Sequence, residues 1–133
     1  MLDSFALIAF FNRESGFEAV KNLLQRSRQS RVPLLMNEVN AGEVFYTRAR
    51  RGSLAQAERF LQSLGSLPIE LVSNSFEDVI EAARLKAQYP ISYGDAFAVA
   101  TAIRMNAVVI TGDREFDAVR HLVHVQWVSP RSS

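Results

Sequence analysis

The feature that most restricts the fold of this chain is one long apolar stretch that combines two kinds of buried segment. Residues 95–105 are alanine-rich and almost wholly apolar, which predicts a helix buried on most of its circumference. Residues 107–111 form a short apolar run before Gly112, which is typical of a strand covered on both faces. Such strands occur in parallel sheets between helices, so the stretch favours an α/β fold.

Strand-like and helical segments alternate along the rest of the chain. Short apolar runs predict further strands at residues 32–36, 68–72 and 121–128, and only Met1 and Leu2 remain for a strand before Asp3. Helices are predicted at residues 5–11, from residue 17 onward, and at residues 38–50, 54–64 and 76–89. We therefore expect a three-layer α/β/α sandwich with a mostly parallel central sheet, forming one domain over residues 1–133, with a tail at residues 130–133.

Capping residues mark the ends of several predicted helices. Asn37 and Ser53 stand where N-caps are needed, and Ser75 with Asp78 has the spacing of a capping box. The helix after Ser75 is expected to turn Phe76, with the apolar residues three, four and seven positions later, toward the core.

Composition excludes several kinds of chemistry. The 133 residues include no cysteine, so disulfides, thiolate nucleophiles and Cys-ligated metals are ruled out. The longest uncharged runs, residues 60–69 and 121–130, are much shorter than the roughly 20 apolar residues of a membrane span. No basic segment precedes the first apolar run, as a signal peptide would require, so we expect a cytoplasmic protein without membrane contact.

Four acidic residues stand beside apolar segments, where an unpaired charge is costly to bury. Asp3 and Asp113 follow predicted strands, Asp95 opens the buried helix, and Glu43 lies among small and apolar neighbours. Ligands of open parallel sheets collect at the carboxyl ends of the strands, where Asp3 and Asp113 would emerge. Asp3, Asp95 and Asp113 also have ordinary interpretations, as a helix cap, a first-turn acid and a turn residue beside Gly112.

Glu43 is harder to explain in ordinary terms, because no cation follows it until Arg48. Glu38 lies five positions earlier, which is about 140° around a helix, so the two glutamates cannot face one site. We expect Glu43 to be the one that faces the other acids.

The residues around these acids resemble the PIN domain family, and more narrowly the VapC-type toxins. The resemblance covers nearly the whole chain and is carried by the Leu-Asp-Ser that ends at Ser4, by Glu43, by SYGDAFAVATA at residues 92–102 and by VITGDREF at residues 109–116. It implies a metal-dependent endoribonuclease that hydrolyses RNA phosphodiester bonds with Mg²⁺ or Mn²⁺. The implied catalytic and metal-binding residues are Asp3, Glu43, Asp95 and Asp113, supported by the hydroxyls of Ser4 and Thr111.

The same resemblance implies partners. VapC-type proteins are the toxins of type II toxin-antitoxin pairs, so a small antitoxin and a homodimer are expected. The apolar residues Phe60, Leu61 and Leu64 could form a groove for either partner, and core packing explains them equally well.

Charge suggests where RNA would bind. The net charge is only +1, yet thirteen of the fifteen cations are arginine, the side chain that forks onto phosphate oxygens. With the four acids turned inward and offset by a metal ion, the remaining side chains would form a basic rim. The candidates for phosphate contact are Arg48, Arg50, Arg51 and Arg114, and a solvated surface is their ordinary interpretation.

Other enzyme classes fit less well. A response-regulator receiver needs a lysine after a late strand, which neither Lys21 nor Lys86 provides, and a haloacid dehalogenase phosphatase needs an acid where Phe5 stands. No dinucleotide-binding or P-loop glycine pattern occurs. The remaining alternative is a catalytically degenerate PIN domain that binds RNA or protein.

Overall fold

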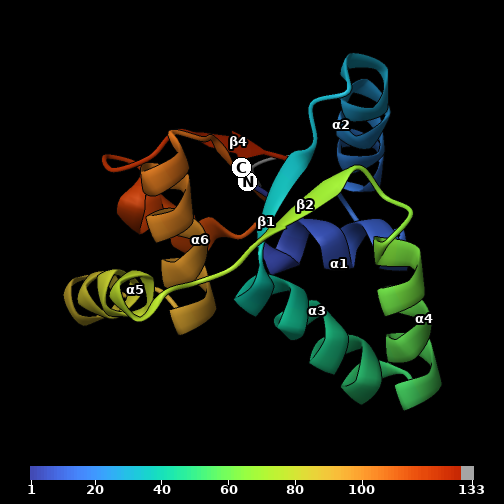
Figure 1. Ribbon diagram of the computed structural model, residues 1–133, viewed down its shortest axis with the longest axis horizontal. Helices are drawn as coiled ribbons and strands as arrows, with labels where there is room; N and C mark the ends of the chain where they lie inside the picture. Colours follow the sequence, from blue (N-terminus) through green and yellow to red (C-terminus); the bar gives the residue numbers. More distant parts are fainter. Residues whose placement is uncertain (130–133) are drawn as a thin grey trace.

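The computed structural model describes residues 1–129, so the predicted tail lies outside the described residues. Helices and short strands alternate along the chain (Figure 1). Their order and bounds are α1 Ser4–Asn12, α2 Phe17–Ser30, β1 Leu34–Asn37, α3 Glu38–Arg51, α4 Leu54–Leu64, β2 Ile69–Val72, α5 Phe76–Gln88, α6 Tyr93–Met105, β3 Val109–Thr111, the 3₁₀ helix η1 Arg114–Val119 and β4 Val125–Trp127. Within residues 1–129, no helix has the length and apolar character needed to cross a bilayer.

The strands form one parallel sheet that is joined at its centre by a single residue. β1 pairs with β2, and β3 pairs with β4. Leu2 makes parallel bridges to Met36 of β1 and to Ile110 of β3. The strand order is therefore β2, β1, Leu2, β3, β4. The very short first strand expected from the sequence is thus the middle position of the sheet.

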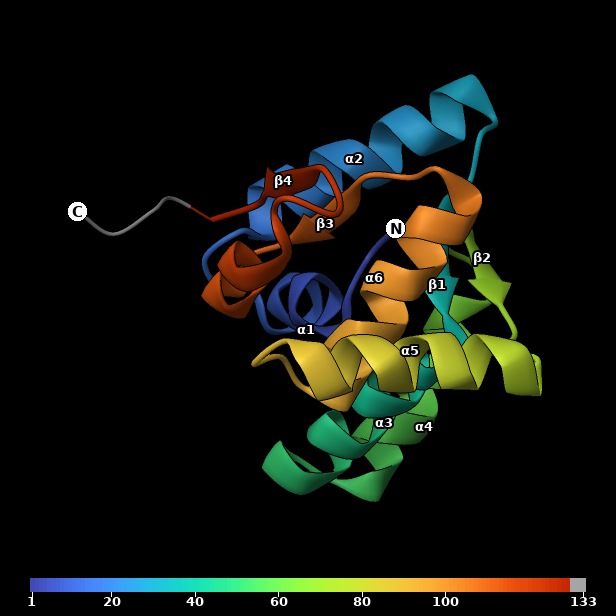
Figure 2. The same cartoon turned by 90° about the vertical axis from the view of Figure 1, so that its left-hand side faces the viewer.

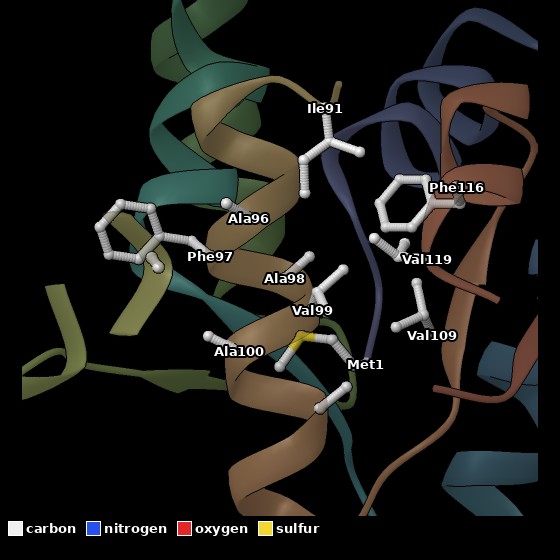
Figure 3. Close-up of a cluster of buried hydrophobic side chains, with 12 residues drawn as sticks. Met1, Ile91, Ala96, Phe97, Ala98, Val99, Ala100, Val109, Phe116 and Val119 are labelled. Carbon is white, nitrogen blue, oxygen red and sulfur yellow. The ribbon is translucent and has the colours of Figure 1, made fainter. Parts of the chain in front are cut away.

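Helices cover both faces of the sheet, with α5 and α6 on one side and α1 and α2 on the other (Figures 1 and 2). Side chains alternate between the two faces, as the period of a strand requires. Met1 and Val109 pack with α6 in one apolar cluster (Figure 3), whereas Leu2 and Ile110 belong to a second cluster with α1 to α4. The predicted α/β fold is confirmed.

Side-chain caps begin the helices at the predicted places. Asn37 accepts a hydrogen bond from the Val39 backbone, and Ser75 and Asp78 form the complete capping box. One boundary differs from the sequence-based prediction, because the Ser92 hydroxyl caps α6 and the helix begins at Tyr93. Asp95 is therefore the third residue of α6 and does not open it.

The prediction for Phe76 is wrong, since this side chain is 76% exposed. The buried face of α5 centres on Ala82, and Phe76 lies six residues earlier, about 120° around the helix. Phe60 and Leu64 of α4 are core residues, whereas Leu61 between them is 48% exposed. Two strands also differ in length: β3 and β4 are shorter than the apolar runs that predicted them.

Candidate active site

The acidic side chains gather where the order of the sheet reverses. Leu2 and β3 are neighbours in the sheet, but the chain passes from Leu2 to β1 on one side and enters β3 only later, on the other side. In open parallel sheets, ligands bind outside the carboxyl ends of the strands at such a switch point. Asp3 follows Leu2 there, and Thr111 ends β3.

Asp3 serves both as a helix cap and as part of the acidic site. Its Oδ1 accepts a hydrogen bond from the Ala6 backbone (2.9 Å), and its Oδ2 accepts one from Thr111 Oγ1 (2.5 Å). The side chain is only 1% exposed. Burial raises the pKa of Asp3 to about 7, and the negative charges of Asp113 and Glu43 act in the same direction.

Asp95 lies in the first turn of α6 and is 5% exposed. The pKa of Asp95 is raised to about 8, mainly by burial and also by a hydrogen bond with Glu115 and the charge of Asp113. Its Oδ2 is buried and has no hydrogen-bond partner among residues 1–129. An unsatisfied buried oxygen of this kind is costly, and it leaves this atom free to interact with a further group.

Asp113 and Glu115 stand at the start of η1, beside Asp95. Asp113 Oδ1 accepts a hydrogen bond from the Glu115 backbone (3.0 Å), and the Asp113 backbone donates to Thr111 Oγ1 (2.9 Å). One carboxylate oxygen each of Asp95, Asp113 and Glu115 lies within 4.8 Å of the other two. The three acids are thus close enough to share one cation.

Glu115 was not among the residues predicted from the sequence. The signal was its position two residues after Asp113 in the turn that follows β3, since both residues emerge at the same edge of the sheet. The 3₁₀ geometry of η1 brings Glu115 back toward Asp95, and this turn cannot be foreseen from an apolar pattern.

Glu43 completes the group from α3. Its Oε1 accepts a hydrogen bond from Asn40 Nδ2 (2.9 Å), and its carboxylate also hydrogen-bonds with the Ser4 hydroxyl. Burial raises the pKa of Glu43, and its charge contributes to the raised pKa of Asp3. Glu38 is exposed on another side of the helix, so the structure brings Glu43, and not Glu38, toward the acids.

Known proteins identify the fold that holds these acids. The sequence model of the PIN domain matches residues 1–122. The chain belongs to the PIN domain family. No curated protein sequence matches the chain.

Solved structures with the same PIN fold are distant in sequence. VapBC2 from Rickettsia felis bound to a promoter DNA fragment is 16% identical, with a TM-score of 0.71 over 95% of this chain and 96% of that chain. DNA-bound VapBC from Salmonella typhimurium is 15% identical, with a TM-score of 0.71 over 96% of both chains. VapBC-1 from nontypeable Haemophilus influenzae is 20% identical, with a TM-score of 0.67 over 96% of both chains.

The donor atoms of this PIN domain suit a hard divalent cation. All the candidate ligands are carboxylate oxygens, which Mg²⁺ and Mn²⁺ prefer, and softer sulfur donors from cysteine are absent from the sequence. The unpartnered Oδ2 of Asp95 gives such a cation a free ligand atom inside the site. Asp3 lies near enough for its charge to act on Asp95, Glu43 lies near enough for its charge to act on Asp3, and both oxygens of Asp3 already accept hydrogen bonds.

The four candidate arginines of the PIN domain occupy different surroundings. Arg114 lies 4.2 Å from the centre of the Trp127 ring and donates to the Ser129 carbonyl, so it anchors the end of β4. Arg48 lies over the Phe11 ring and donates to Asn12 Oδ1. Arg50 and Arg51, at the end of α3, make no ion pair with any residue among the described 129.

Proposed function

We propose that this PIN domain is a metal-dependent endoribonuclease that hydrolyses RNA phosphodiester bonds and acts as the toxin of a type II toxin-antitoxin pair. The observation that carries the proposal is the convergence of carboxylates at the switch point of the sheet. They come from four separate parts of the chain, and two of them, Asp3 and Asp95, are almost fully buried. Burying several acids together disfavours folding unless a cation offsets them.

The proposed cation ligands are Asp95, Asp113 and Glu115 on one side of the site, with Asp3 and Glu43 on the other. A bound Mg²⁺ or Mn²⁺ ion supplies an acidified water molecule and offsets the negative charge that develops on the phosphodiester. The protein's own contribution is to hold the carboxylates in place before substrate arrives. Thr111 donates to the Asp3 carboxylate and accepts from the backbone of Asp113, and Ser4 hydrogen-bonds with the Glu43 carboxylate.

RNA would reach this site along the basic rim. Arg50 and Arg51 are free of carboxylate partners within the described chain, which leaves their guanidinium groups available for phosphate oxygens. Arg48 and Arg114 are each held by an aromatic ring and by a hydrogen bond, whereas Arg50 lies over the Tyr46 ring without a side-chain hydrogen bond among residues 1–129. We therefore assign Arg50 and Arg51 to direct contact with RNA. Arg48 and Arg114 would add to the positive electrostatic potential around the site.

The proposed protein partners are a small antitoxin and a second copy of the chain. The similar solved structures named VapBC motivate the antitoxin. An apolar groove lined by Phe45, Leu61, Leu64 and Leu71 offers a surface for one of these partners. Leu61 is the exposed member of the predicted apolar set, so Leu61 rather than Phe60 would contact the partner.

Cleavage of RNA by the purified protein tests the proposed activity. The wild-type chain should cut RNA in the presence of Mn²⁺ or Mg²⁺ and lose the activity in EDTA. Asp95→Asn should be inactive, whereas Glu38→Gln, an exposed glutamate at the start of α3, should cut at the wild-type rate. Metal-independent cleavage, or cleavage that persists in Asp95→Asn, would contradict the proposal.

Binding without cleavage would favour the degenerate PIN domain instead. In that case RNA or a protein partner should bind the wild-type chain and Asp95→Asn equally well. For the toxin role, expression of the chain should arrest growth, and co-expression of an antitoxin encoded beside it should relieve the arrest. Growth that is unaffected by the active protein would leave a nuclease without the toxin role.

A further inference from the structure

Asn40 joins two helices beneath the acidic site. It lies inside α3, is fully buried, and donates from Nδ2 to Glu43 Oε1 (2.9 Å) and to the Gly94 carbonyl of α6 (3.0 Å). Asparagine is a poor residue for a helix interior, because its side chain competes for backbone hydrogen bonds. One of its two side-chain hydrogen bonds reaches an acid of the site, Glu43, and the other reaches the residue before Asp95.

Gly94 leaves the space that the Glu43 carboxylate occupies. A methyl group at residue 94 would overlap with both carboxylate oxygens of Glu43. The backbone of Gly94 is helical and needs no positive φ, so the glycine is not required for the path of the chain. What its missing side chain provides is room for Glu43, directly before Asp95.

We propose that Asn40 and Gly94 are positioning residues that set where the Glu43 carboxylate stands, Asn40 by hydrogen bonding and Gly94 by having no side chain. Together with Ser4 they form the Glu43 seat. The seat ties Glu43 of α3 to the first turn of α6, which carries Asp95, and so fixes the two sides of the acidic site relative to each other. The inference rests on the proposed function, in which Glu43 contributes to a cation site.

Gly94→Ala tests the seat with little risk to the fold. Alanine favours a helix over glycine, and the group that must move is the end of a flexible side chain. The melting temperature without metal should therefore stay level or rise. Mn²⁺ affinity, measured by calorimetry without RNA, should fall by about 10- to 100-fold, which is the usual effect of losing a residue that orients a ligand.

Gly42→Ala is the matched control. Gly42 is the residue before Glu43 on α3, and a methyl group there would meet no atom within 4 Å. This variant should bind Mn²⁺ as the wild type does. Equal Mn²⁺ affinity in the wild type, Gly42→Ala and Gly94→Ala would overturn the seat.

Combining each change with Glu43→Ala shows whether it acts through Glu43. In a chain that already lacks the Glu43 carboxylate, Gly94→Ala and Asn40→Ala should cause no further loss of Mn²⁺ affinity. Asn40→Ala should lower the melting temperature in both backgrounds, because it removes a buried hydrogen bond between α3 and α6. Additive losses of Mn²⁺ affinity would mean that the two residues do not work through Glu43.

A measurement without metal separates the seat from the nuclease proposal. The side-chain amide NMR signals of Asn40 should shift in Gly94→Ala, where Glu43 is displaced, and stay in place in Gly42→Ala. Unchanged Asn40 signals in Gly94→Ala would overturn the seat. A wild-type chain that binds no Mn²⁺, yet shows the expected Asn40 shifts, would overturn the proposed metal site and leave the seat standing.

Discussion

The acidic site contains two kinds of carboxylate that differ in their access to water. Asp3 and Asp95 are almost fully buried, and their pKa values are raised to about 7 and about 8, chiefly by burial. Asp113 is half-buried and Glu115 is exposed, at the start of η1. The ionised form of the buried pair therefore destabilises the fold, whereas water can solvate the charges of the outer pair.

The largest expected effect is a difference in RNA cleavage rate between a variant that lacks a buried carboxylate and a variant that lacks an outer carboxylate. Asp95→Asn deletes a ligand whose position is set by α6, so RNA cleavage should fall by more than about 100-fold. Glu115→Gln removes an exposed ligand that water can replace, and its loss should be nearer about 10-fold. Initial rates at saturating Mn²⁺ measure both. Equal losses would abolish the distinction between buried and outer acids.

The buried pair should make the metal-free protein less stable as pH rises. A raised pKa means that the folded state holds a proton that the unfolded state releases near pH 4. Stability is therefore greatest in mild acid and falls between about pH 4 and pH 8, by on the order of a few kcal/mol. Urea unfolding in EDTA across this range measures the decline.

Substitution sharpens this pH test. Asp95→Asn removes one of the two ionisations, so at pH 8 the metal-free variant should be at least as stable as the wild type. Glu115→Gln, which removes an exposed acid, should leave the decline unchanged. A wild-type stability that is flat from pH 5 to pH 8 would mean that Asp3 and Asp95 ionise normally.

Mn²⁺ should restore the stability that the metal-free protein loses at neutral pH. Binding to the folded state alone adds about 2.7 kcal/mol when the free ion exceeds Kd by a hundredfold, which raises the melting temperature by several degrees. Since protons compete for Asp3 and Asp95, the gain should begin to shrink as pH falls below about 7. Thermal melts at millimolar Mn²⁺ measure it. A gain that persists unchanged at pH 5 would exclude the buried pair as ligands.

A comparable contrast exists between two arginines, one held by an aromatic ring and one without an ion pair, and substituting them should have smaller effects than substituting the acids. Arg51→Ala should reduce the dependence of RNA affinity on log salt by about one unit, and should change the free energy of unfolding by less than about 0.5 kcal/mol. Arg114→Ala should instead destabilise the fold by about 1 kcal/mol, because it loses the Trp127 ring. RNA titrations at several salt concentrations, with urea unfolding, separate the two. A salt slope unchanged in Arg51→Ala would remove Arg51 from the RNA interface.

The sequence predicts the fold well where one local signal decides the structure. The capping box at Ser75 and Asp78 and the buried helix after Ser92 depend on neighbouring residues, so the pattern contains what is needed. The sequence does not predict the exposure of Phe76 correctly, because the face of α5 that becomes buried depends on how α6 packs against it. It also fails for the start of α6, where a hydroxyl cap competes with an acid at the next turn.

The site is predictable to a similar extent. The four predicted acids lie near enough for their charges to act on one another, since strand ends and one helix face are visible in the pattern, and their roles stay a prediction. Burial is the largest cause of the raised pKa values of Asp3 and Asp95, and the depth of a side chain depends on the whole fold, so these pKa values cannot be predicted from the sequence. Glu115 and the Glu43 seat arise from a 3₁₀ turn and a contact between helices, which no linear pattern contains.

The joining of the sheet through Leu2 has a consequence for the order of events during synthesis. The hydrogen bond between Thr111 and Asp3 spans 108 residues, and Leu2 needs both β1 and β3 as neighbours. Contacts between such distant residues form late in folding, because the long loop between them must be closed first. A growing chain on the ribosome carries Asp3 for 108 residues before Thr111 is added, and the acids after Thr111 follow later still. The acidic site therefore cannot assemble during synthesis until β3 and the acids that follow it have left the ribosome.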